Sequence, residues 1–177
     1  VAGLHRVLSV LDMPITPTEP DEPTPLPRGR LDIAIEHVDY SYPIRIGEHI
    51  DSVAGGGVLV LRDISLLIPA GQQVAMVGST GSGKTTLGRL IARFADPTNG
   101  TVAVGGVPLT DVARSDLRSR LVVVSQEPFL FDDTVERNIA FARSGANRAD
   151  VEAIVRDLDV GEWVDALSEG LDTRVGE

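Results

Sequence analysis

The sequence predicts an α/β fold in which a glycine-rich loop joins a buried strand to a helix. The loop reads Gly78-Ser79-Thr80-Gly81-Ser82-Gly83-Lys84-Thr85-Thr86. Residues 74–77 before it form a continuous apolar run, as buried parallel strands do. After the loop, apolar residues recur at helical spacing, at Leu87, Leu90, Ile91 and Phe94.

The loop fits G-x-x-x-x-G-K-[ST], the phosphate-binding P-loop, in the strand–loop–helix context that this motif requires. Its glycines let backbone N–H groups converge on one anion, and the helix N-terminus adds partial positive charge. We expect Lys84 to meet the β- and γ-phosphates of a nucleotide and the Thr85 hydroxyl to ligate Mg²⁺. The alternative is a glycine-rich turn capping an ordinary helix. Lys84 is the only lysine beside fifteen arginines, which favours a role for its compact ammonium.

Composition narrows the function classes. A length of 177 residues suits one domain or slightly more. The net charge of −10 argues against a nucleic-acid partner, since nucleic-acid-binding proteins normally carry a basic stripe. The absence of cysteine excludes disulfides and thiol chemistry. No apolar run is long enough to span a membrane, and Val at position 1 suggests a chain cut from a longer protein.

A boundary is predicted before residue 31. Residues 1–12 show helical spacing of apolar side chains, typical either of the tail of an amphipathic helix or of a short surface helix. Residues 13–30 contain six prolines, which predict an extended, semi-rigid linker that cannot bury a core.

The segment after this boundary is predicted to be mainly β. Residues 31–36 alternate apolar and polar side chains, as a half-buried strand does, and the strand ends near Tyr42. Tyr40 and Tyr42 share a face, so they could form a platform for a flat base, although these two residues alone favour packing. Residues 44–57 are predicted to be a mobile loop.

Further strands and a helical block follow. Residues 58–61 and 64–68 are strand-like, and residues 102–107 predict a hairpin around Gly105-Gly106. Residues 121–124 predict a second continuous apolar strand, which leads to Gln126. Three helices are then expected: one capped by Asp133 or Thr134 and running through Phe141, one marked by Val151, Ile154, Val155 and Leu158, and one containing Trp163 and Leu167.

These motifs, in this order, resemble the nucleotide-binding domain of ABC transporters, most closely the exporter type. The residues that carry the resemblance are Tyr42-Pro43, the P-loop, the run from Val124 to Val135, and Asn138-Ile139. The resemblance implies a P-loop NTPase fold with an N-terminal antiparallel β-subdomain and the start of a helical subdomain. It divides the chain into residues 1–30, the end of a membrane-domain helix plus linker; 31–132, the P-loop and β part; and 133–177, a partial helical subdomain.

The resemblance also implies roles for particular residues. Tyr42 resembles the aromatic residue that stacks on adenine, and Gly78 to Thr86 resemble the phosphate cradle of ATP. Gln126 is similar to the glutamine that reaches Mg²⁺ and the attacking water. Its expected place at a strand end suits a ligand group, although a buried structural glutamine is the alternative.

The implied partners lie in the parent protein. They are a membrane domain, whose coupling helices would meet the loop from Glu127 to Asp133, and a second nucleotide-binding domain. The implied location is the cytoplasmic face of the plasma or inner membrane, where the parent would couple ATP hydrolysis to export. Three other functions stay open: a small soluble P-loop kinase, a soluble ABC protein acting on ribosomes or DNA, and a non-catalytic ABC remnant.

Four of the family's motifs do not occur in the 177 residues: the Leu-Ser-Gly-Gly-Gln signature, the aspartate that supports Mg²⁺, the neighbouring glutamate and the switch histidine. Strands of that region normally lie between residues 74–77 and 121–124. We therefore expect these two runs to be separated or abnormally paired, and the isolated chain to be unstable and prone to aggregate.

The purified 177-residue chain is predicted not to hydrolyse ATP, because phosphoryl transfer needs the absent groups as well as the P-loop. Phosphate release with and without Mg²⁺ is the measurement. Magnesium-dependent turnover that disappears in Lys84→Ala would contradict the prediction.

Overall fold

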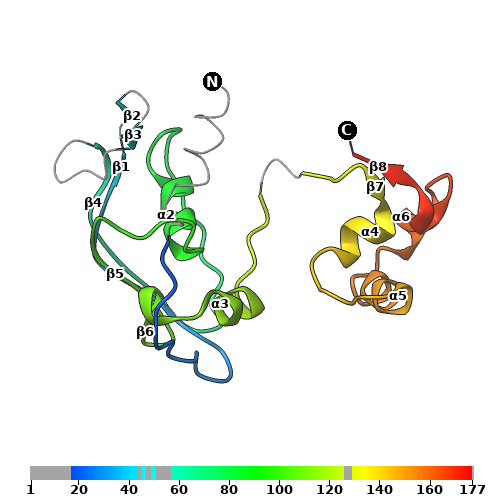
Figure 1. Cartoon of the computed structure of the whole chain (residues 1–177), viewed down its shortest axis with the longest axis horizontal. Helices are drawn as coiled ribbons and strands as arrows, with labels where there is room; N and C mark the ends of the chain where they lie inside the picture. Colours follow the sequence, from blue (N-terminus) through cyan, green and yellow to red (C-terminus); the bar gives the residue numbers. More distant parts are fainter. Residues whose placement is uncertain (1–16, 44, 47–48, 51–56, 126–128, 177) are drawn as a thin grey trace, which may run out of the picture. The chain divides into compact units, whose positions relative to one another are not determined.

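A computed structural model describes residues 17–43, 45–46, 49–50, 57–125 and 129–176 (Figure 1). The helix expected in residues 1–12 therefore lies outside the described residues. The chain forms two compact units, Val1–Val123 and Val124–Glu177, and each has its own hydrophobic core.

The first unit is built on a four-stranded sheet with the order β4-β1-β5-β6 (Figure 1). Its strands are β1 (Ile33–Tyr42), β4 (Val58–Ile68), β5 (Asn99–Val104) and β6 (Val107–Pro108). Every strand pair in it is antiparallel, which confirms the predicted antiparallel β-subdomain. The predicted hairpin also forms, because Gly105 and Gly106 supply the positive φ values (58° and 77°) that its turn requires.

The two strand-like segments at 58–61 and 64–68 form the single strand β4, which carries an irregularity opposite another in β1. His37 and Asp63 both have a φ of 48° there, and His37 Nδ1 lies 2.7 Å from Asp63 Oδ1. The Asp63 N–H donates to Asp39 Oδ1 at 2.7 Å. The Asp39 carboxylate thus accepts from a backbone N–H where the strand leaves regular β geometry.

The segment 44–57, for which the sequence predicts a mobile loop, contains two short strands. β2 (Arg45–Ile46) and β3 (His49–Ile50) pair as a small antiparallel hairpin there. The other residues between Pro43 and Gly57 lie outside the described ones.

The described part of the first unit also contains α2 (Lys84–Ile91), the 3₁₀ helix η1 (Leu109–Asp111) and α3 (Arg114–Arg120). The predicted helical stripe after the loop is confirmed for Leu87 and Leu90, which are buried in the core. Phe94, by contrast, lies beyond the end of α2 and is 47% exposed.

The two predicted buried strands at 74–77 and 121–124 do not form. Both runs lie outside every described strand pair. Their side chains are exposed, with Val77 at 94% and Val124 at 93%, except for Leu121, which is half-buried against the core. The abnormal pairing expected as one outcome is therefore not seen among the described strand pairs. The strands do not form because a strand is stable only with a partner on its edge, and no described segment supplies one.

Residues 17–30, which we call the strap, have no helix or strand of their own yet pack against the rest of the first unit. Leu26 is only 8% exposed and belongs to the core. The Leu26 N–H donates to Asp116 Oδ2 and the Thr24 N–H donates to Asp111 O, at 2.8 and 2.7 Å. The expectation that this proline-rich segment buries no core is therefore wrong for Leu26.

The second unit is a small helical cluster with a short strand pair. It contains β7 (Asp133–Thr134), α4 (Val135–Ala140), α5 (Arg148–Asp157), α6 (Gly161–Asp165), the 3₁₀ helix η2 (Gly170–Asp172) and β8 (Arg174–Val175). The predicted cap at Thr134 is confirmed, since its side chain accepts from the Arg137 N–H. α5 begins with a capping box between Asn147 and Asp150. Of the expected helix faces, Val151 and Val155 are buried, whereas Ile154, Leu158 and Trp163 are exposed.

The His37–Asp63 pair predicts a measurable pH dependence. The hydrogen bond and the charge of Asp63 raise the pKa of His37 above its ordinary value of 6.5. The resulting stabilisation is fully present below the unfolded pKa and is lost as the pH rises through the folded pKa. In Asp63→Asn, which tolerates the positive φ, the His37 pKa measured by NMR should fall towards 6.5. The difference in the free energy of unfolding between the wild type and this variant should be larger below the His37 pKa than above it. An unchanged His37 pKa would contradict the role of the Asp63 charge.

Candidate phosphate-binding site

The glycine-rich loop curves into the N-terminus of α2, as the sequence predicts. Gly83 is the N-cap with a φ of 88°, and its carbonyl accepts from the Leu87 N–H at 2.9 Å. Inside the loop, the Ser82 N–H donates to Ser79 O at 3.2 Å. The first turn of α2 contains no acidic residue, so the positive end of the helix is not neutralised from within.

Lys84 folds back into the loop. Its Nζ donates to Gly78 O at 2.7 Å, to Ser79 O at 2.8 Å and to Ser82 Oγ at 3.2 Å. An ammonium has three donors, so the loop occupies all of them. The loop is thus wrapped around a single positive charge.

The loop glycines differ in the neighbours that a Cβ atom would meet at each position. A Cβ on Gly78 would lie 2.7 Å from Ser82 Oγ and 3.9 Å from Lys84 Nζ, inside the curve of the loop. A Cβ on Gly83 would lie 2.6 Å from Leu61 Cδ2, so only glycine lets the first turn of α2 approach β4 this closely. A Cβ on Gly81 would meet nothing within 4 Å, and that position needs glycine only for its φ of 82°.

The predicted aromatic residue lies beside the same helix. Tyr42 is half-buried, and its hydroxyl is 3.1 Å from the Thr86 hydroxyl. Its ring contacts Tyr40 edge-to-face, with centroids 5.0 Å apart and planes at 86°. The two rings share a face, as expected from their spacing, but they are perpendicular rather than coplanar. Burial raises the pKa of Tyr40, which keeps this ring neutral at ordinary pH.

The predicted Mg²⁺ ligands are Thr85 and Gln126. Thr85 is exposed beside Lys84, whereas Thr86 is buried. Gln126, the other expected Mg²⁺ ligand, lies outside the described residues. In the part of the chain that the structure describes, no group of three or more His, Cys, Asp or Glu side chains could hold a metal ion.

Arg93 is a residue that the sequence analysis missed. It follows α2 and is 7% exposed, and its guanidinium donates to Val112 O and Thr18 O, both at 2.8 Å. It also contacts Thr110 O and Asp96 Oδ1, both at 3.3 Å. Nothing in composition or periodicity distinguishes this arginine from its fourteen counterparts, because its acceptors are backbone carbonyls from distant segments.

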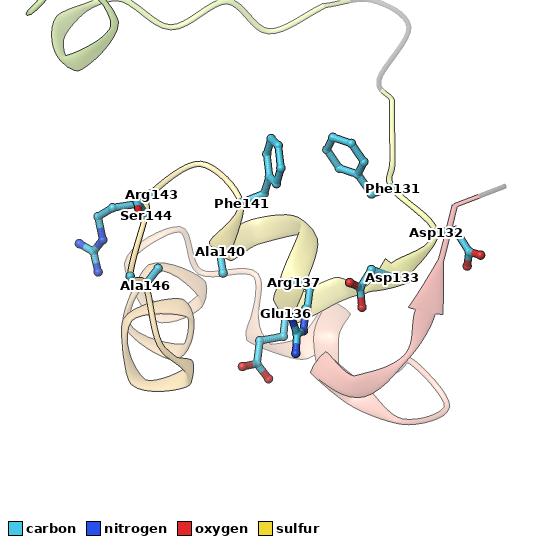
Figure 2. Close-up of a pocket in the computed structure, with 11 residues that line it drawn as sticks. Phe131, Asp132, Asp133, Glu136, Arg137, Ala140, Phe141, Arg143, Ser144 and Ala146 are labelled. Carbon is cyan, nitrogen blue, oxygen red and sulfur yellow. The ribbon is translucent and has the colours of Figure 1, made fainter. Parts of the chain in front are cut away.

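The second unit has an open pocket of about 810 Å³, lined by residues of the 131–146 segment. Phe129 and Phe141 each contact Phe131, with ring centroids 5.1 and 4.4 Å apart. Figure 2 shows the Phe131 and Phe141 rings directed away from the Glu136 and Arg137 side chains. The pocket therefore combines an exposed aromatic cluster with charged residues of both signs.

A glycine-rich loop around one lysine at a helix N-terminus defines a P-loop nucleotide-binding protein. Comparison with known proteins is more specific: the model of the ABC transporter family matches residues 61–176. The chain belongs to this family, and its fold is that of a P-loop NTPase.

Individual relatives agree with this assignment. The chain is 38% identical over 177 residues to an ATP-dependent lipid A-core flippase of Chromobacterium violaceum, covering all of this chain and 28% of the relative. It is 37% identical over 175 residues to a fatty acid ABC transporter ATP-binding/permease protein of Mycobacterium bovis, covering 99% of this chain and 26% of the relative. The chain thus spans little more than a quarter of the length of these relatives.

A solved structure also supports the assignment to the ABC transporter family. A bacterial Atm1-family ABC exporter with ATP bound aligns with a TM-score of 0.80 and 31% identity, covering 99% of this chain and 29% of that one. Among the helices that the structure describes, none is long and apolar enough to cross a bilayer.

Replacement by alanine should destabilise the protein less at Gly81 than at Gly83. Gly81→Ala should reduce the free energy of unfolding by about 1 kcal/mol, through backbone strain alone. Gly83→Ala should cost a further ~1–3 kcal/mol, because the new methyl group displaces the buried Leu61 side chain. Urea unfolding of both variants is the measurement, and equal costs would contradict the close contact at Gly83.

Proposed function

We propose that the chain binds ATP at the P-loop and is the nucleotide-gripping part of an ABC exporter. The observation that carries the proposal is the Lys84 ammonium held inside a glycine-rich loop at the N-terminus of α2. The ATP-bound exporter supports it, because that protein aligns with nearly the whole of this chain.

The residues present fit a nucleotide phosphate. The inner side of the loop is free of side chains at Gly78, where a Cβ would crowd Ser82. The loop offers backbone N–H groups, a helix dipole and one ammonium, all of which stabilise anions. Because Lys84 already uses its three donors, a phosphate oxygen would replace one of the loop acceptors, and the 3.2 Å contact to Ser82 Oγ is the longest of the three.

Mg²⁺, when bound with ATP, neutralises the charge of the β- and γ-phosphates. Thr85 is the residue of the described chain proposed to hold it, and Gln126 is proposed as the second ligand. Both proposals come from the family resemblance, with the exposure of Thr85 as support. Tyr42 is proposed to bind the adenine, and its bond to Thr86 would keep the ring beside the P-loop helix.

In the parent protein, ATP binding and hydrolysis would be coupled to export across a membrane. The names of the relatives, a lipid A-core flippase and a fatty acid transporter, support this function. The proposed partners are a membrane domain and a second nucleotide-binding domain at the cytoplasmic face of the membrane. The aromatic pocket of the second unit is proposed to receive the membrane domain. The family match favours this function over that of a small soluble kinase.

Lys84→Ala should weaken ATP binding by about 10–100-fold, because hydrogen bonds to charged groups contribute ~1.5–3 kcal/mol. Isothermal titration of the 177-residue chain with ATP and Mg²⁺ is the measurement. The control is Arg156→Ala, which removes an exposed positive charge from the second unit and should bind as the wild type does. Unchanged affinity in Lys84→Ala would overturn the proposal.

A further inference from the structure

The strap is tied to the first unit at several points along its length. At its start, Arg114 Nη2 donates to Pro17 O at 2.8 Å and the Arg114 N–H donates to Glu19 Oε1 at 2.7 Å. In its middle, the Thr24 and Leu26 N–H groups donate to Asp111 and Asp116. At its end, Arg120 donates to the carbonyls of Pro27 and Gly29.

Arg93 connects this strap to the P-loop helix. Its backbone N–H donates to Leu90 O at 2.9 Å, in the last turn of α2, while its Nη2 donates to Thr18 O. Since α2 has eight residues, its ends are about 12 Å apart. One rigid element therefore carries the nucleotide site at its N-terminus and the strap at its C-terminus.

We propose that Arg93 is a positioning residue that couples the strap to the P-loop, so that ATP binding and strap attachment favour one another. The proposal rests on the proposed nucleotide binding. The physical argument is that each event restricts the motion of the same helix, so the second event costs less ordering once the first has occurred. Coupling free energies are reciprocal. ATP binding therefore changes the equilibrium constant of strap attachment by the same factor by which strap attachment changes the affinity for ATP.

The chemistry of Arg93 suits this role. A guanidinium has five donors spread over three nitrogens in a planar fork, so Arg93 reaches acceptors on different sides, whereas a lysine has three donors on a single nitrogen. The side chain is 5% exposed, and its Nε lies 3.3 Å from Asp96 Oδ1. Val112 O and Thr110 O anchor the same guanidinium beside η1, so the strap contact is held against a fixed part of the core.

Hydrogen exchange of the Thr24 and Leu26 amides in the 177-residue chain tests the coupling directly, because both N–H groups are bonded only when the strap is attached. ATP should slow their exchange in the wild type by about fivefold, the lower end of typical coupling between sites. Arg93→Lys should speed their exchange in the absence of ATP and weaken ATP binding by a similar factor. Its exchange should no longer respond to ATP.

A second variant guards against a simple loss of folding. Arg114→Ala removes the side-chain contacts to Pro17 O and to Glu19 Oε2, at 2.8 and 3.6 Å, and so loosens the start of the strap, although the backbone N–H bond to Glu19 remains. It changes no residue of α2, and the Arg114 side chain is 47% exposed. It should speed the exchange of Thr24 and weaken ATP binding by about the same factor. Arg28→Ala, at an exposed position of the strap, is the matched control and should change neither quantity.

The outcomes separate this proposal from the nucleotide site itself. If ATP binds but the Thr24 and Leu26 amides exchange equally fast with and without it, the coupling is wrong and the site stands. If Arg114→Ala frees the strap while ATP affinity is unchanged, the coupling is also wrong. If no variant and no wild-type chain binds ATP, the proposed nucleotide binding itself is wrong, and the coupling is wrong with it.

Discussion

The close approach of Gly83 to Leu61 is the constraint on which the first unit depends. Without a Cβ at Gly83, the first turn of α2 lies against β4, and Leu87 and Leu90 enter the core from the same helix. The Tyr42–Thr86 hydrogen bond then fixes the end of β1 against that turn. The far end of the helix is held by Arg93. Two strands and one buried arginine therefore position the helix that carries the phosphate loop.

Local chemistry explains which features could be predicted from the sequence. The Gly105-Gly106 turn, the Thr134 cap and the P-loop each depend on residues a few positions apart, so their geometry follows from the residues themselves. The runs at 74–77 and 121–124 were correctly recognised as apolar, but an apolar run becomes a strand only when a distant segment pairs with it. The strap contacts were missed for the same reason, since arginine side chains from α3 and from the end of α2 bind carbonyls about 75 to 97 residues away.

In the second unit, ion pairs connect helices that surround only a small hydrophobic core. Arg148 bonds Glu136 at 2.7 Å and Asp172 at 2.8 Å, which joins α5 to α4 and η2, and these contacts raise the pKa of the arginine further. Arg143 bonds Asp150 at 2.6 Å and, with the capping contact of Asn147, lowers the pKa of that carboxyl. These pairs are exposed, so screening limits their contribution to stability. They connect the short helices that surround the buried Val151 and Leu171.

The two ends of the P-loop are held very differently, and this asymmetry bears on its function. On the exit side, α2 is fixed by Leu61, Tyr42 and Arg93. On the entry side, Val77 is 94% exposed, and residues 74–77 belong to no described strand pair. The proposed phosphate binding would order the loop, and ordering a backbone costs about 1–2 kcal/mol per residue. Any part of that cost that falls on residues 74–77 would subtract from the affinity that we propose for Lys84 and the helix N-terminus. A strand paired beside residues 74–77 would therefore strengthen ATP binding without touching the nucleotide.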